Sequence, residues 1–425
     1  MRSLITVGLD VGTTKVSAIA AELSNKGMHI LGAGVAPSKG LKKGMIVNID
    51  ATVDAITKAV REAEASSGIR IKSVYVTVSG MHIKSFDSSG AVGVRGKEVA
   101  YTDISRAVDS AKAVYMPLDR EVIHVVPTEF ILDGQESITD PLGMCGVRLE
   151  AKVHIVTGAV SSLQNLFKCC AKAGLGVADV VCAPVASAYC ILTKEEKESG
   201  AILVDIGGGT TGIAFFKDNS LRHTGVLGIG GNHLTNDISV GLRIPVPEAE
   251  RIKKESGAAF EGLVRGGEEI TVAQPNGQER ALPRKYIAEI LQPRCEEMIE
   301  MIREEIKKSS AYETAVCGIV LTGGSSLLKG IDRMTESILG LPTRTGAPGS
   351  MRGLKAAAGS PADAAALGLI TCAFESGAHG ILGPDAFESV FGRITDRLKG
   401  IFKYKDYLNF TIRKEGGMVC LKSRK

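Results

Sequence analysis

Stretches with helical periodicity and stretches with strand periodicity alternate along the 425-residue chain. Residues 51–66 place apolar side chains at helical spacing, and residues 73–79 alternate as a strand rich in β-branched side chains. Helical spacing returns at residues 161–173. Regular alternation of this kind is typical of an α/β fold.

Residues 84–160 interrupt the alternation. They combine one helical stretch, residues 103–114, with strand-like runs at residues 122–126 and 151–157. This pattern predicts an α+β subdomain inserted into the α/β frame.

Two further helices are expected in the second half of the chain. Residues 284–308 have helical spacing and follow a polar turn at residues 273–279, where Pro275, Asn276 and Gly277 stand together. Residues 361–373 are small and apolar and also predict a helix.

Two segments far apart in the chain share one local pattern of an apolar run, an aspartate, glycine and two threonines. The first consists of Asp10, Gly12, Thr13, Thr14 and Lys15, and the second of Asp205, Gly207, Gly208, Gly209, Thr210 and Thr211. A strand-like run follows each segment. The repetition predicts two related α/β halves that face one another.

This pattern suits the phosphate chain of a nucleotide held with a divalent metal ion. Glycines let the backbone approach closely and direct its N–H groups at phosphate oxygens. The threonine hydroxyls add donors, and Lys15 can neutralise a terminal phosphate. Asp10 and Asp205 would then flank a hydrated Mg²⁺, an ion that keeps several waters and contacts few carboxylates.

A dinucleotide-binding motif is the main rival for the second segment, because residues 207–212 match the GxGxxG pattern. That motif requires a helix after the glycines, whereas residues 213–216 are strand-like and residues 217–220 have turn composition. The sequence contains no Walker GxxxxGK[ST] motif either. A β-hairpin with a glycine turn is therefore favoured.

Composition narrows the function classes. The net charge of +4 is small for this length and offers no reason to expect nucleic acid as a partner. The nine cysteines are scattered without zinc-site spacing, which is typical of reduced, buried thiols. The N-terminal apolar run is too short for a signal peptide, and the longest apolar stretch, residues 364–374, is too short to span a bilayer. Any membrane contact is therefore expected to be peripheral.

The two loops resemble the phosphate motifs of the superfamily of actin, sugar kinases and heat-shock chaperones. Residues 321–326 resemble its adenosine motif, and residues 183–192 and 362–373 resemble its two connecting helices. The resemblance implies a two-lobed, actin-like α/β fold with duplicated ribonuclease H-like halves. It also implies ATP and Mg²⁺ as cofactors, with Gly323, Gly324 and Ser325 at the nucleoside.

The inserted region narrows the resemblance to FtsA, the cell-division actin homologue. Residues 122–136 and 141–157 are similar to FtsA at this point. Carried over, Gly230, Gly231 and Asn232 would approach the phosphates, and Glu250 and Lys253 would hold the adenosine. Because Glu250 and Lys253 stand three apart on a helical stretch, they would suit a solvated helix surface equally well.

The same resemblance implies a division of the chain into subdomains. These are 1A at residues 1–83, completed by 161–198 and 356–384; the inserted 1C at 84–160; 2A at 199–228 and 312–355; 2B at 229–311; a membrane-targeting helix at 385–403; and a basic tail at 404–425.

ATP hydrolysis is left open by the sequence. Many ATPases of this superfamily place a glutamate or glutamine near the first connecting helix to orient the attacking water. Residues 182–189 contain no carboxylate or amide side chain, and general-base assistance is typically worth about 10²–10⁴-fold in rate. Binding of ATP with slow hydrolysis or none is the expectation.

Residues 385–403 carry the second informative pattern, an amphipathic helix suited to lie in a lipid headgroup layer. A core-packing helix is the ordinary alternative for such spacing, but FtsA carries its membrane-targeting helix at this place. The apolar face comprises Phe387, Val390, Phe391, Ile394, Leu398, Ile401 and Phe402, and the basic boundary includes Arg393, Arg397 and Lys399. Unlike the usual FtsA pattern, 22 residues (404–425) follow this helix.

The FtsA resemblance implies a filament-forming adaptor. It would lie at the cytoplasmic face of the inner membrane at the division site, bind the C-terminal tail of FtsZ, self-associate and help recruit later division proteins. Arg284, Lys285 and Arg294 are candidate contacts to the FtsZ tail, because basic side chains suit an acidic peptide. A sugar or acetate kinase of the same fold and a PilM-like pilus-assembly scaffold are the alternatives.

Overall fold

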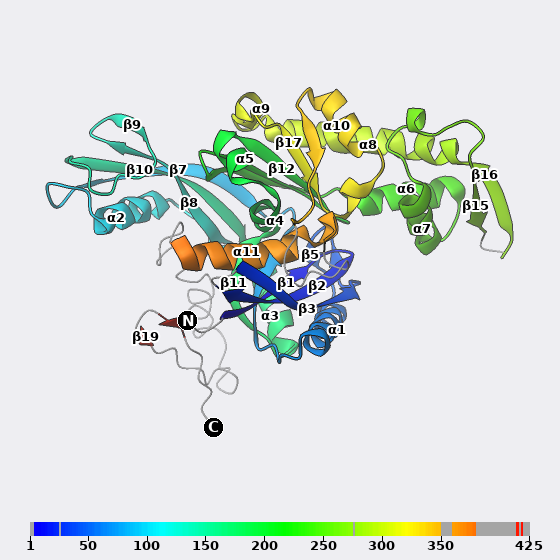
Figure 1. Ribbon diagram of the computed structural model, residues 1–425, viewed down its shortest axis with the longest axis horizontal. Coiled ribbons are helices and arrows are strands. Elements are labelled where there is room, and N and C mark those ends of the chain that lie inside the picture. The colour runs from blue at the N-terminus through cyan, green and yellow to red at the C-terminus, as the bar shows by residue number, and fades with distance from the viewer. Residues whose placement is uncertain are drawn as a thin grey trace.

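The computed structural model describes residues 4–24, 27–274, 277–349, 359–379, 414–415 and 418–419. Two lobes lie one above the other, with smaller subdomains projecting at opposite ends of the molecule (Figure 1). Each lobe is built on a five-stranded sheet.

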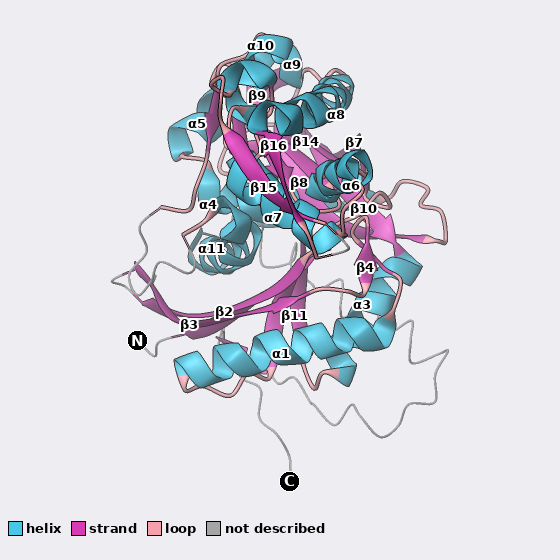
Figure 2. Cartoon of the chain, turned by 90° about the vertical axis from the view of Figure 1, so that its right-hand side faces the viewer, coloured by secondary structure: helices cyan, strands magenta, loops and turns pink. Residues whose placement is uncertain are grey.

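The first lobe contains the sheet β11-β6-β1-β2-β3, in which β1, β2 and β3 form an antiparallel meander and β6 and β11 extend it in parallel. Helices α1 and α3 cover its lower face (Figure 2). The elements are β1 (Leu4–Val11), β2 (Lys15–Ser24), β3 (Gly27–Pro37), β4 (Leu41–Lys42), β5 (Met45–Ile46), α1 (Ile49–Ser67), β6 (Ser73–Val78), α3 (Val160–Lys172) and β11 (Gly176–Cys182).

Helix α1 illustrates how local sequence sets these bounds. The side chain of Asn48 accepts a hydrogen bond from the amide of Ala51 at the N-terminus, and Gly68 ends the helix in the left-handed conformation. The face that carries Ile56 and Val60 is buried against the sheet, as the helical spacing predicted.

The second lobe repeats the first sheet. Its order is β14-β13-β12-β17-β18, again an antiparallel meander extended by parallel strands. The elements are α5 (Lys194–Ser199), β12 (Ala201–Ile206), β13 (Thr211–Lys217), β14 (Ser220–Leu227), α9 (Ala311–Thr314), β17 (Ile319–Thr322), η2 (Gly324–Leu327), α10 (Ile331–Leu339) and β18 (Thr343–Thr345). The predicted duplication of α/β halves is confirmed.

Two helices cross between the lobes, α4 (Ala183–Ile191) and α11 (Ala364–His379), the latter preceded by the short helix η4 (Pro361–Asp363). They pack directly on one another because Gly368 has no side chain: a Cβ there would lie 1.9 Å from the carbonyl oxygen of Ala186. The buried side chains of α4 and α11 join the core of the first lobe to the second sheet.

The inserted subdomain forms one end of the molecule (Figure 1). Its sheet, β7-β10-β8-β9, is antiparallel and packs on α2 around a core of its own. The elements are β7 (Lys84–Gly93), α2 (Tyr101–Lys112), β8 (Arg120–Leu132), β9 (Gln135–Ile138) and β10 (Arg148–Ala159). Helix α2 begins and ends two residues before the helical stretch that the sequence predicted.

The opposite end is helical and carries one small hairpin (Figure 1). Its elements are α6 (Gly231–Leu242), α7 (Val246–Ser256), η1 (Glu261–Leu263), β15 (Glu269–Ala273), β16 (Glu279–Pro283) and α8 (Arg284–Ile306). The predicted turn falls between the paired strands β15 and β16, and its Pro275 and Asn276 lie outside the described residues. The fold class expected from the sequence, two actin-like lobes with an inserted α+β subdomain, is confirmed.

The amphipathic segment 385–403 lies outside the described residues, and so does the 404–425 tail except for the short strands β19 (Lys414–Glu415) and β20 (Met418–Val419). Among the described helices none is both long and apolar enough to cross a membrane.

Candidate functional site

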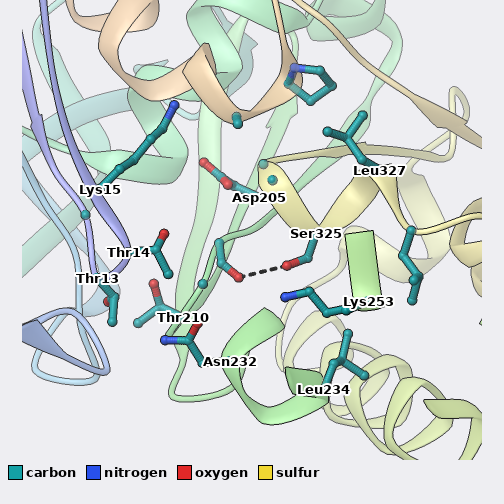
Figure 3. Close-up of a pocket in the computed structure, with 18 of the residues that line it drawn as sticks. Thr13, Thr14, Lys15, Asp205, Thr210, Asn232, Leu234, Lys253, Ser325 and Leu327 are labelled. Atoms are coloured by element: carbon teal, nitrogen blue, oxygen red, sulfur yellow. Dashed lines mark hydrogen bonds between the residues drawn. The ribbon is translucent and has the colours of Figure 1, made fainter. Parts of the chain in front are cut away.

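A cavity of about 670 Å³ opens between the two lobes, within the size range of small-molecule sites. Both glycine turns reach it, and residues from the two lobes face one another across it (Figure 3). The predicted site residues that line it are Asp10, Gly12, Thr13, Thr14, Lys15, Asp205, Gly207, Gly208, Thr210, Asn232, Glu250, Lys253, Gly323, Gly324 and Ser325.

The first turn joins β1 to β2. The amide of Gly12 donates to the carbonyl of Lys15 at 3.0 Å, which closes a tight hairpin. The hydroxyl oxygen of Thr13 accepts a hydrogen bond from the amide of Gly44 at 3.1 Å. The loop before α1 therefore holds one of the two threonines of the first turn.

The second turn has the same construction. The amide of Gly207 donates to the carbonyl of Thr210 at 2.9 Å, and β13 pairs antiparallel with β12. The predicted hairpin is confirmed, and a dinucleotide-binding loop is excluded because a strand follows the glycines. A Cβ on Gly208 would lie 2.2 Å from Cγ2 of Thr14, so any side chain there would have to displace Thr14 where the turns meet.

Helix α6 starts beside the second turn. The amides of Gly231 and Asn232 donate to the carbonyls of Gly207 and Gly208 at 2.9 and 2.7 Å. The partial positive charge of this helix N-terminus therefore lies next to the turn, a place that favours anions. The side chain of Asn232 reaches the cavity (Figure 3).

The two aspartates of the turns are both partly buried. Thr77 Oγ1 donates to Asp10 at 2.6 Å, and Ser187 Oγ donates to Asp205 at 2.6 Å. Burial raises the pKa of Asp10 despite the bond from Thr77, and burial raises the pKa of Asp205 to about 6 despite the bond from Ser187. A nearby cation stabilises the ionised form of such carboxylates. Two carboxylates beside hydroxyls and backbone amides therefore fit a hydrated Mg²⁺ next to phosphates.

At another part of the cavity wall, Lys253 and Glu250 on α7 form a cluster with Thr235. Lys253 Nζ lies 2.7 Å from Glu250 Oε2 and donates to the carbonyl of Gly231 at 3.1 Å. Burial alone would raise the pKa of Glu250, but bonds from Lys253 and Thr235 hold it below its usual value. Both residues line the cavity, and their side chains are 12% and 31% exposed.

The adenosine-type loop after β17 packs on the second turn. Ser325 Oγ donates to the carbonyl of Gly207 at 3.2 Å, the contact dashed in Figure 3. Gly323 has φ +84°, and a Cβ there would lie 2.3 Å from Asp205 Oδ1. Only glycine allows this close approach.

Four predicted cofactor residues stand behind the cavity surface. Thr211 is buried and donates to the carbonyl of Ile229 at 2.9 Å. Gly209 packs against Thr13, Gly230 packs against the second turn, and Gly231 receives the bond from Lys253. These four residues support the second turn from behind and do not line the cavity.

Sequence reasoning missed Thr77, Ser187 and Asp363 at this site. Ser187 lies in the first connecting helix and Asp363 at the start of the second, so these two stand inside motifs that were recognised. Asp363 accepts from Lys15 Nζ at 2.5 Å. The three carry no signal of their own because their roles depend on the packing of distant segments.

The three basic residues predicted to contact a partner have different acidic neighbours. Arg284 lines the cavity and binds Glu268, with Nη1 2.6 Å from the carboxylate oxygen. Lys285 lies 3.1 Å from Glu261, and Arg294 binds Asp237 of α6 at 2.7 Å. Each is already paired with an acid of its own chain.

The duplicated sheets, the crossing helices and the cleft between the lobes define an actin-like protein. Among solved structures, the chain resembles the PilM–PilN type IV pilus biogenesis complex, with 16% identity, TM-score 0.62 and coverage of 86% of this chain and 97% of the other. It resembles MreB5 of Spiroplasma citri bound to ADP with 16% identity, TM-score 0.51 and coverage of 89% and 98%. At this identity both likenesses show the fold alone.

Sequence comparison is more specific. Residues 202–368 match the family model of cell division protein FtsA, and residues 80–157 match the SHS2 domain inserted in FtsA. The cell division protein FtsA of Pseudomonas aeruginosa is 42% identical over 377 residues, 88% of this chain and 90% of that protein. The Escherichia coli K12 protein is 35% identical over 385 residues, covering 88% and 92%. The chain belongs to the FtsA family of cell-division proteins.

Proposed function

We propose that this protein binds ATP with Mg²⁺ between its lobes and tethers the FtsZ ring to the cytoplasmic face of the cell membrane. The observation that carries the nucleotide site is the meeting of two equivalent aspartate–glycine hairpins at one cavity. The MreB5 structure was solved with ADP, which supports a nucleotide in this fold.

The residues divide by the part of the nucleotide that they would hold. Gly12, Thr13 and Thr14 would cradle the phosphates from one lobe, and Gly207, Gly208 and Thr210 from the other. Glu250, Lys253 and the loop at Gly323, Gly324 and Ser325 would hold the nucleoside. Mg²⁺ would neutralise phosphate charge, and Asp10 and Asp205 would hold it through its waters.

Hydrolysis would be slow. Of the helix α4 side chains, Ala183 reaches the cavity and Ser187 is bonded to Asp205, and α4 contains no carboxylate or amide side chain. Because no general base comes from this helix, nucleotide occupancy rather than turnover would control the protein's shape and its polymerisation.

The cell-division role rests on family membership and on the amphipathic pattern of residues 385–403. A helix of that pattern would lie in the headgroup layer as a peripheral anchor at the division site. Filaments of this chain on the membrane would bind the FtsZ tail and gather later division proteins. Family membership favours this role over a kinase or a pilus scaffold.

For the FtsZ tail, the exposed part of α8 is the proposed contact. Arg294 and Lys285 can exchange their own acidic partners for those of a peptide, whereas Arg284 belongs to the cavity wall. Replacing Arg294 with Glu is expected to weaken binding of the FtsZ tail peptide by about tenfold, measured by fluorescence anisotropy.

Nucleotide and lipid binding are tested separately on the full chain. Calorimetric titration with ATP and Mg²⁺ should show binding that Asp205→Ala removes. Sedimentation with vesicles containing anionic lipid should be lost when Phe391 and Ile394 are changed to Ser. The matched control is Leu118→Ser, since Leu118 is a strongly exposed apolar residue of the inserted subdomain. Sedimentation that survives the 391/394 change would contradict the anchor.

A further inference from the structure

The first phosphate turn is tied to the second connecting helix by one ion pair. Lys15 Nζ lies 2.5 Å from Asp363 Oδ1, and the two side chains are 26% and 6% exposed. Figure 3 shows the Lys15 side chain extending away from Thr13 and Thr14. The residue expected to neutralise a terminal phosphate therefore already has an anionic partner from its own chain.

Asp363 needs that partner. It is the last residue of η4 and directly precedes α11, and it is buried between the lobes. A buried carboxylate without a cation is strongly destabilising, so its charge and that of Lys15 are balanced as a pair. Asp363 also acts on the rest of the site: after burial, its negative charge is one of the causes that raise the pKa of Asp10.

A phosphate that enters the first turn therefore meets a lysine whose charge is largely compensated. A triphosphate brings more negative charge towards Lys15 than a diphosphate does, so compensation of the Lys15 charge by Asp363 weakens binding of the triphosphate more strongly. The ammonium group has three donors, and a phosphate oxygen takes one or more of them from the carboxylate.

We propose that Asp363 is a positioning residue that competes with the terminal phosphate for Lys15 and so lowers the preference of the site for a nucleoside triphosphate over a diphosphate. The inference rests on the proposed ATP site. The competition also reaches α11, because the carboxylate that would give up Lys15 lies directly before this helix, which packs on α4 and β1.

The test is the ratio of the dissociation constants for ADP and ATP, each measured with Mg²⁺ by calorimetry on the full chain. Asp363→Asn keeps the shape of the side chain and removes its charge. It is expected to tighten ATP binding about tenfold and ADP binding much less, so that the ratio rises by close to that factor. Asp332→Asn is the matched control, because Asp332 lies in the first turn of another helix, α10, and does not line the cavity.

A double-mutant cycle shows whether Asp363 acts through Lys15. In a Lys15→Gln background, Asp363→Asn should leave the ADP-to-ATP ratio unchanged. A ratio that still rises there would overturn the inference, because Asp363 would then act on the phosphate independently. Thermal melting checks the fold, and Asp363→Ser replaces the Asn variant if that variant does not fold.

The remaining outcomes are decisive as well. A ratio within about twofold of the wild type, or weaker ATP binding by Asp363→Asn, would show that the pair is a structural tie or a support for the phosphate and would overturn the competition. Wild-type protein that binds neither nucleotide would refute the ATP site itself, and the inference with it. If the wild type binds both nucleotides and Asp363→Asn has the same ADP-to-ATP ratio, the inference is wrong but the ATP site is supported.

Discussion

The two halves of the molecule use the same turn but hold its aspartate in different ways. Both turns close with one backbone bond of nearly equal length, Gly12 to Lys15 at 3.0 Å and Gly207 to Thr210 at 2.9 Å. Asp10 is then held by Thr77, which lies on β6 of the same sheet. Asp205 is held by Ser187, which lies on the connecting helix α4.

Because their aspartates are bonded to different elements, the two turns depend on different parts of the molecule. In the first turn, Asp10 is supported within its own sheet, and only Lys15 is paired outside it, with Asp363 before α11. The second turn depends on where α4 lies, and α4 is packed on α11 between the lobes. A change in the angle between the lobes would therefore move the support of Asp205 more than the support of Asp10.

The largest expected effect comes from separating the two connecting helices. Gly368→Val places a branched side chain where even a Cβ would lie 1.9 Å from the Ala186 carbonyl oxygen. We expect the free energy of unfolding to fall by about 4 kcal/mol or more, measured by chemical denaturation. Gly266→Val is the control, since Gly266 has open space around its Cβ position. Equal stability of both variants would contradict the close crossing.

The edge strands β11 and β18 of the two sheets differ, because only β11 carries a buried acidic residue. This difference predicts that stability depends on pH through the first lobe. Burial raises the pKa of Asp179 on β11 to about 7, whereas β18, the equivalent strand, carries no acidic residue. The folded state binds this proton more tightly than the unfolded state. The contribution of Asp179 to stability is therefore full below its unfolded pKa near 3.8 and is lost as the pH rises towards 7.

Replacing Asp179 with Asn removes this dependence. The variant should exceed the wild type in stability by about 2–3 kcal/mol at pH 8, and the difference should shrink to near zero at pH 4. Denaturant unfolding at both pH values measures it. A difference that stays constant with pH would show that Asp179 does not titrate between these limits.

The next largest effect is expected from removing the hydroxyl groups of Ser187 and Thr77, which donate hydrogen bonds to Asp205 and Asp10. Ser187→Ala and Thr77→Ala each leave a partly buried carboxylate without a hydroxyl donor, which costs about 1–2 kcal/mol. Both should weaken binding of ATP with Mg²⁺ by about tenfold in calorimetry. Spin labels on the two lobes sharpen the comparison, because only Ser187→Ala should change the distance between them.

The smallest effect is expected at the hydrogen bond that joins the second turn to the first lobe. The hydroxyls of Ser79 and Thr210 lie 3.2 Å apart. Ser79→Ala should reduce the free energy of unfolding by about 0.5–1 kcal/mol, with a similar loss in nucleotide affinity. An affinity loss as large as that of Ser187→Ala would place the main link between the lobes at Ser79 instead of α4.

Much of the fold could be predicted because short segments determine it. Periodicity identified α1, α3 and α8 within a few residues, and an apolar run after each glycine turn identified the hairpins. The duplicated order of aspartate, glycine and threonine located the cavity. The FtsA resemblance and their charge make Arg284, Lys285 and Arg294 candidate contacts to an acidic peptide, but the sequence did not show that each is paired with an acid of its own chain.

The sequence by itself determined the class of the protein, because backbone conformation at the glycine turns and the spacing of apolar residues are local properties. Only the tertiary structure decided what surrounds each aspartate of those turns. Thr77 reaches Asp10 and Asp363 reaches Lys15 from segments 67 and 348 residues away along the chain. Such contacts are made by the crossing of helices and the pairing of parallel strands, and no short pattern of residues records them.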